Sequence, residues 1–117
     1  MPWSSGLHPG LRPAAEAFVS AIQQAGVRVQ ITSVRRSTSK QAALYRAYIT
    51  GESRLPAAKP GTSKHQKGLA FDMVVPSLAG LSVADMTKAM LPIGELWESI
   101  GGRWGGRFRD PVHFEAP

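Results

Sequence analysis

The chain contains no cysteine, which excludes disulfide bonds and metal sites built from thiolates. It also has no apolar stretch near the roughly 20 residues that a membrane-spanning helix needs, and residues 1–6 show no basic region followed by an apolar run. We therefore expect a soluble chain without a signal peptide. Any metal site must use carboxylates and the 3 histidines present.

The chain is short and basic. Its 117 residues contain no repeat and are long enough for one domain, residues 1–117, with a core that needs no disulfide. The net charge of +6 predicts attraction to polyanions, although an ordinary solvated basic surface would have the same composition. No nucleic acid is expected as a partner, because aromatic and basic residues do not interleave on one strand or helix.

Hydrophobic periodicity predicts short helices and strands in mixed order, which favours an α+β fold with a small antiparallel sheet flanked by helices. Strands are predicted at residues 27–32 and 69–75. Helices are predicted at residues 11–25, 39–48, 82–90 and 93–100. Five apolar residues around the last helix are interpreted as core: Leu91, Ile93, Leu96, Trp97 and Ile100.

Asp72 lies inside the apolar run of residues 69–75, where an ionised carboxylate is costly unless it is paired, hydrogen-bonded or bound to a metal. His65 precedes it by seven residues, and an extended chain would hold the two roughly 23 Å apart. If the two side chains act together, the chain must bend between them. Gly68 is where that bend is easiest, because glycine tolerates dihedrals that other residues avoid.

The pattern Ser-x-His-x-x-Gly-x-Ala-x-Asp resembles the zinc-site signature of the LAS peptidases, a family of cell-wall enzymes that includes D-Ala-D-Ala peptidases and phage L-Ala-D-Glu endolysins. The segment from Trp104 to Phe114 resembles the closing motif of that family, with an acidic residue three before a histidine. Five residues fill the first pattern: Ser63, His65, Gly68, Ala70 and Asp72.

The resemblance implies that His65, Asp72 and His113 hold a zinc ion. The alternative is a buried Asp72 satisfied by backbone N–H groups, together with two ordinary histidines. The remaining histidine, His8, lies beside a proline and is interpreted as a surface or capping side chain.

Hydrolysis at such a zinc site also needs a group that takes a proton from water and delivers it to the leaving amine. Asp110, three residues before His113, is the candidate, although relatives often carry the longer Glu there. Asp110-Pro111 also favours a type I turn, and both roles are compatible. Glu115 is the rival base, or alternatively a partner that orients a ligand imidazole.

The resemblance extends to residues 32–45, where it implies that Arg36 orients the substrate and steadies the developing oxyanion. Val34 and Arg35 replace the Gly-aromatic pair that is usual in the family. Gln41, and Ser63 at the end of the long loop of residues 51–67, are expected to contact the substrate.

The expected function is therefore that of a zinc peptidase that cleaves a bond in peptidoglycan stem peptides, either as an L-Ala-D-Glu endopeptidase or as a D-Ala-D-Ala carboxypeptidase. The alternative is a catalytically silent zinc-binding or wall-binding module of the same fold. We expect a monomer, made in the cytoplasm, that another agent carries to the cell wall. Anionic wall polymers are possible further partners of its basic surface.

Overall fold

The computed structural model describes residues 2–34, 38–53 and 64–117, and it describes the side chains of the second helix from residue 42 onward. Its α-helices are α1 (Arg12–Gln24), α2 (Thr38–Ile49), α3 (Val83–Ala89) and α4 (Leu91–Ser99). Its strands are β1 (Gln30–Ser33), β2 (Ala70–Val74), β3 (Arg103–Trp104) and β4 (His113–Glu115). Short 3-10 helices are η1 (Trp3–Gly6), η2 (Lys64–Lys67), η3 (Pro76–Leu78) and η4 (Gly105–Phe108).

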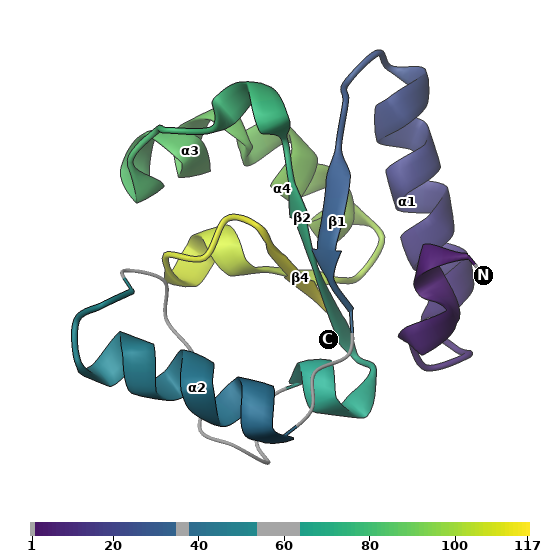
Figure 1. Cartoon of the computed structure of the whole chain (residues 1–117). Helices are drawn as coiled ribbons and strands as arrows, with labels where there is room; N and C mark the ends of the chain where they lie inside the picture. Colours follow the sequence, from purple (N-terminus) through teal and green to yellow (C-terminus); the bar gives the residue numbers. More distant parts are fainter. Residues whose placement is uncertain (1, 35–37, 54–63) are drawn as a thin grey trace.

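The four strands form one antiparallel sheet in the order β1-β2-β4-β3. In Figure 1, α1 lies along one side of this sheet. Helix α2 lies on the other side, below the yellow segment that carries β4. This arrangement is the α+β fold with a small antiparallel sheet that the sequence predicts. None of the helices that the structure describes is both long and apolar enough to span a lipid bilayer.

One face of the sheet forms the hydrophobic core. Phe71 on β2 lies directly opposite Phe114 on β4, and their rings stack with centroids 5.5 Å apart. Phe18 of α1 and Trp97 of α4 pack against these rings with centroid separations of 5.3 to 6.3 Å, and against each other at 5.0 Å. Burying such aromatic side chains contributes the largest apolar areas available to a small core. The opposite face of β2 and β4 is thereby left for polar residues.

The element boundaries agree with the predictions to within a few residues, apart from the first strand. Residues 27–32 alternate in burial as predicted, but the hydrogen-bonded strand begins only at Gln30. The predicted cap of α3 is confirmed, because the Ser82 hydroxyl accepts the backbone N–H of Asp85 at 3.1 Å.

The prediction that the apolar residues around α4 all belong to the core is wrong for three of them. Leu91, Leu96 and Ile100 are exposed, with relative exposures of 38%, 39% and 50%. Only the stripe with helical spacing that includes Ile93 and Trp97 faces the sheet. The small sheet covers one side of α4, so apolar residues elsewhere on the helix stay in water.

Candidate metal centre

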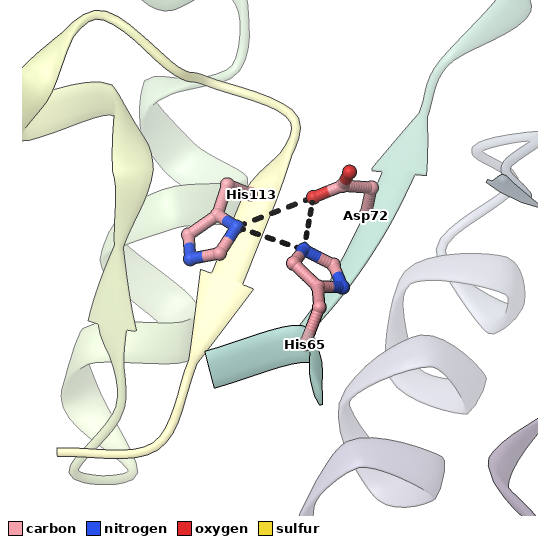
Figure 2. Close-up of side chains that lie close together, drawn as sticks. All are labelled: His65, Asp72 and His113. Atoms are coloured by element: carbon pink, nitrogen blue, oxygen red, sulfur yellow. Dashed lines mark hydrogen bonds and ion pairs between the residues drawn. The ribbon is translucent and has the colours of Figure 1, made fainter. Parts of the chain in front are cut away.

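Three side chains from different elements meet on the polar face of the sheet: His65 of η2, Asp72 of β2 and His113 of β4 (Figure 2). His65 Nε2 lies 3.1 Å from Asp72 Oδ1 and 3.2 Å from His113 Nδ1. The third side of this triangle, from His113 Nδ1 to Asp72 Oδ1, is 3.3 Å. The structure therefore joins the three residues that the two sequence motifs single out.

Strand register explains why Asp72 and His113 meet. They are direct partners in the antiparallel pairing of β2 with β4, and directly opposed residues project to the same face of a sheet. Their neighbours Phe71 and Phe114 therefore point to the core. One register thus produces a hydrophobic face and a polar site.

The predicted bend at Gly68 brings His65 into the group. Gly68 has φ of +72°, a conformation that L-residues rarely adopt, and a Cβ there would lie 2.9 Å from the carbonyl oxygen of Gly6. The turn reverses the chain between η2 and β2, so His65 folds back onto the strand that follows it.

Hydrogen bonds on the outer side of each imidazole fix which nitrogen faces the centre. His65 Nδ1 lies 2.9 Å from the carbonyl oxygen of Val34, which can only accept, so Nδ1 carries a proton. In the same way, His113 Nε2 donates to Glu115 Oε1 at 2.8 Å. The other nitrogen of each ring, His65 Nε2 and His113 Nδ1, therefore faces Asp72.

Three acceptors that converge in this way require a positive charge between them. Burial alone would lower the pKa of His113, but hydrogen bonds to Asp72 and Glu115 outweigh it and raise this pKa to about 9. A proton on His113 Nδ1 supplies the charge when no cation does. A metal cation fits the same position, because two neutral imidazoles and a carboxylate are common ligands of divalent metals.

The cluster is enclosed on one side and open on the other. The His65 side chain is 1% exposed, whereas those of Asp72 and His113 each keep 12% of their surface accessible. A cation held here would therefore remain within reach of water or a substrate on the Asp72 and His113 side.

Glu115 contacts His113 and two cations. Its Oε2 lies 2.7 Å from Lys64 Nζ and 3.9 Å from Arg103, while its Oε1 accepts from His113. Burial would raise the pKa of Glu115, but the hydrogen bonds from His113 and Lys64 lower it to about 2. Glu115 is therefore an ionised group hydrogen-bonded to the outer nitrogen of the His113 ring.

Asp110 begins the turn that leads into β4. Its carbonyl oxygen accepts the His113 N–H at 3.0 Å, as predicted for an Asp-Pro turn, and its own N–H donates to Gly105 O at 2.8 Å. A Cβ at Gly105 would lie 2.2 Å from the Asp110 carbonyl oxygen and 2.8 Å from the Cβ of His113. The turn thus packs closely against His113, with the Asp110 side chain half-buried.

Some predicted site residues fall outside this description. Arg36 and Ser63 lie outside the described residues, and Gln41 lies in α2 where side chains are not described. His8 is exposed, and its Nδ1 accepts the N–H of Gly10 at 3.1 Å, in line with the capping role expected for it.

Sequence reasoning missed two contributors to the site. Lys64 binds Glu115, and its Nζ also donates to the Ala116 carbonyl oxygen at 2.8 Å, although no pattern links it to residues about fifty positions later. The Val34 carbonyl is a backbone group, so nothing in the side-chain sequence marks it. The one available signal was the position of Lys64 directly before His65.

Fold and site together define a class of protein: a small α+β domain with a His-Asp-His cluster on an antiparallel sheet. The family model of the VanY D-alanyl-D-alanine carboxypeptidases matches residues 4–94, a range that includes His65 and Asp72 and stops before His113. The chain belongs to this family. It is also 32% identical over 127 aligned residues to the peptidoglycan L-alanyl-D-glutamate endopeptidase CwlK of Bacillus subtilis (strain 168), covering 98% of this chain and 76% of that protein.

Solved structures share the fold. The LdcB LD-carboxypeptidase superposes with a TM-score of 0.66 at 24% identity over 97% of this chain, which spans 66% of that chain, just under two thirds. The D,D-pentapeptidase VanY of a VanB-type resistance cassette, solved as a variant in complex with Zn(II), has a TM-score of 0.66 at 19% identity. That match covers 94% of this chain and 72% of the VanY chain.

Proposed function

We propose that this protein is a zinc-dependent peptidase that hydrolyses a peptide bond in the stem peptides of peptidoglycan, with the L-alanyl-D-glutamate bond as its preferred substrate. Membership of a peptidase family supports the reaction. The relative that is 32% identical along nearly the whole chain, an L-alanyl-D-glutamate endopeptidase, favours that bond over the D-alanyl-D-alanine bond.

The geometry of the cluster is the observation that carries the metal assignment. Zinc bonds to histidine and carboxylate at about 2.0 to 2.2 Å, and tetrahedral angles then separate two ligand atoms by about 3.3 Å. The three separations between His65 Nε2, Asp72 Oδ1 and His113 Nδ1 are 3.1, 3.2 and 3.3 Å. The triangle therefore has the size of one face of a zinc tetrahedron, which leaves the fourth corner for water or substrate.

Zinc bound by these residues would lower the pKa of water towards about 7 and polarise the scissile carbonyl. The protein supplies the remaining groups. Asp110 is proposed to accept the proton of the attacking water and to deliver it to the leaving amine. Two observations support this role: a 3.0 Å backbone hydrogen bond closes the turn from Asp110 to His113, and the charge of Asp110 contributes to the raised pKa of His113.

Glu115 is a poorer candidate for the base than Asp110. A base that works near neutral pH needs a pKa close to that pH, whereas Glu115 is held at about 2 with one oxygen on His113 and the other on Lys64. Its proposed role is to keep a proton on His113 Nε2, so that Nδ1 presents its lone pair to the metal.

The substrate itself is proposed to contact Arg36, Gln41 and Ser63. Arg36 would hold the carbonyl oxygen that gains negative charge, and the other two would hydrogen-bond the peptide backbone. Val34, two residues before Arg36, lies 2.9 Å from the His65 ring, and Lys64 follows Ser63 directly. Described residues one or two positions from Ser63 and Arg36 thus contact His65 or Glu115, which supports this proposal.

Digestion of defined stem-peptide fragments tests the function. Zinc-loaded protein should release alanine-terminated and glutamate-starting products that mass spectrometry identifies, and fragments ending in D-alanyl-D-alanine should be cut more slowly. Chelation should stop the reaction, and added zinc should restore it. Full activity of protein shown to be metal-free would contradict the mechanism, while faster release of D-alanine would reassign the bond.

Two variants separate metal binding from proton transfer. His113→Ala should lose both zinc and turnover. Asp110→Asn should keep zinc and fold while losing turnover by a factor on the order of 100 to 10,000, the usual contribution of acid–base catalysis. If neither variant changes turnover, the peptidase proposal fails. If zinc binds but no fragment is cut even by the unaltered protein, the chain is the silent module considered as the alternative.

A further inference from the structure

A cavity of about 550 Å³ lies between α3 and η4, outside the cluster itself. This volume falls within the range of about 300 to 1,000 Å³ that is typical of small-molecule sites. Its lining residues come from α3 and from the end of η4: Val83, Ala84, Thr87, Lys88, Gly106 and Arg109. In Figure 1, α3 and the segment that carries η4 face each other on the side of the molecule away from α1.

Two cations, Lys88 and Arg109, line this otherwise largely apolar cavity. Within the described part of the chain, no carboxylate forms a salt bridge with either of them. Arg107 differs, because Glu98 holds its guanidinium at 2.7 and 3.0 Å and the group lies over the Trp104 ring. Lys88 and Arg109 are therefore available to an anionic ligand.

The backbone of Arg109 is a second, independent observation. Arg109 has φ of +65°, and it is the only non-glycine residue with positive φ in the described ranges. Gly or Asn occupies such a position at lower energy, and unfavourable backbone conformations of this kind cluster at functional sites. The chain thus has a large cation at a position where glycine or asparagine would be more stable.

The wall of the cavity is connected to the proposed catalytic groups. Arg109 directly precedes Asp110, and Gly106 directly follows Gly105, which packs against His113. The Phe108 ring, in the same short helix, lies 5.9 Å from the His113 ring. The cavity and the metal cluster therefore share one wall, the η4 turn.

The chemistry of the leaving group determines what this cavity can receive. Asp110 is proposed to protonate the amine that is released when the bond breaks. In an L-alanyl-D-glutamate bond, the carbon that bears this amine also bears the α-carboxylate of the D-glutamate, which remains free where the stem continues through the side-chain carboxylate. A cation that lines a cavity and directly precedes Asp110 in the chain is therefore a candidate partner for that carboxylate.

We propose that the cavity between α3 and η4 is the subsite for the leaving part of the stem peptide, and that Arg109, with Lys88, binds the free α-carboxylate of its D-glutamate. This inference rests on the proposed function. Thr87 and the apolar side chains of α3 provide the contact surface for the rest of the released peptide. Arg109 therefore sets specificity, since it distinguishes a carboxylate from a carboxamide at that carbon.

Paired substrates test the proposal. Two fragments are compared that differ only in whether the α-group of the D-glutamate is a carboxylate or a carboxamide. The unaltered protein should cleave the acid with the higher kcat/KM, roughly 3- to 30-fold, because one or two partly solvated charge contacts are lost with the amide. The difference should reside in KM.

Substitutions assign the preference to the cavity. Arg109→Gln should bring the ratio of acid to amide kcat/KM close to one, and Lys88→Gln should lower it in part. Arg109→Gly should abolish the preference while raising the unfolding midpoint, because it removes the backbone strain. Arg28→Gln, which removes one exposed charge before β1, is the matched control and should keep the full preference.

Equal cleavage of acid and amide by the unaltered protein would overturn the subsite, as would an Arg109→Gln variant that retains the preference. Both results still leave a working peptidase. Failure of the proposed function has a different signature, since neither fragment would then be cut, whatever residue occupies position 109.

Discussion

We propose that Glu115 acts on His113 and not on a substrate, because one of its oxygens accepts from His113 and the other lies against Lys64. We expect Glu115→Gln to weaken zinc binding about 10- to 100-fold, the usual effect of removing a carboxylate that orients a ligand imidazole. The amide can present its NH₂ to His113 Nε2, which would favour the wrong tautomer. Competition with a chromophoric chelator measures the affinity directly.

Glu52→Gln is the control for Glu115→Gln, since Glu52 is exposed and next to the end of α2. At saturating zinc, Glu115→Gln should recover most of its turnover, whereas Asp110→Asn should not. Loss of turnover that saturating zinc fails to restore would make Glu115 the base and would remove that role from Asp110.

At the level of single residues, the sequence predicts the residues of the proposed metal site better than it predicts the contacts that hold them in place. His65 and Asp72 stand out because the motif around them is specific and because a carboxylate is misplaced in an apolar strand. Lys64 does not stand out, since its 2.7 Å contact to Glu115 exists only once β2 and β4 have paired. Contacts between residues far apart in the chain depend on register, which composition and spacing do not encode.

At the level of elements, the turn at Gly68 is predicted to determine whether His65 reaches the strand. Gly68→Ala should lower the free energy of unfolding by roughly 2 kcal/mol or more, because alanine is disfavoured at positive φ and its Cβ would press on backbone atoms of Gly6 and His8. Zinc affinity should fall as well, since relief of this clash moves η2 away from β2. Chemical denaturation of metal-free protein and chelator competition measure the two effects.

Gly26→Ala is a matched control for the turn. Gly26 has φ of +89° at the end of α1, but a Cβ there would meet nothing within 4 Å. Gly26→Ala should therefore lower the free energy of unfolding by about 1 kcal/mol, the cost of placing alanine at positive φ, and leave zinc affinity unchanged. Equal destabilisation by both substitutions would show that the close approach at Gly68 is unimportant.

Elements were predictable where one physical signal dominated. The strand at residues 70–74 and the helix at residues 12–24 follow from clear periodicity, and the Asp110 turn follows from Asp-Pro chemistry. The prediction for α4 was wrong because apolar residues lie on more than one side of this helix. Periodicity alone could not show which side a sheet of four short strands would cover. Leu91, Leu96 and Ile100 remain exposed for that reason.

At the scale of the whole molecule, 14 basic residues exceed 8 acidic ones, and several of the acidic groups are engaged internally. Glu115 binds Lys64, Glu98 binds Arg107, and Asp72 belongs to the cluster. Other exposed cations, such as Arg28, Arg46 and Lys67, have no carboxylate partner within the described residues. The excess charge therefore faces solvent, where it can attract an anionic wall polymer.

Binding to intact anionic cell walls should consequently weaken as salt increases. Screening shortens the range of these charges from about 10 Å at 0.1 M to about 3 Å at 1 M, so sedimentation with purified walls should show a loss of about tenfold or more across that interval. Cleavage of the soluble α-carboxamide fragment should change much less, because it involves few charge contacts. The double substitution of Arg28 and Arg46 by glutamine should reduce wall binding at low salt and have little effect at high salt. Wall binding that stays constant from low to high salt would instead require a specific uncharged contact, and the basic surface would then have no part in placing the enzyme at its substrate.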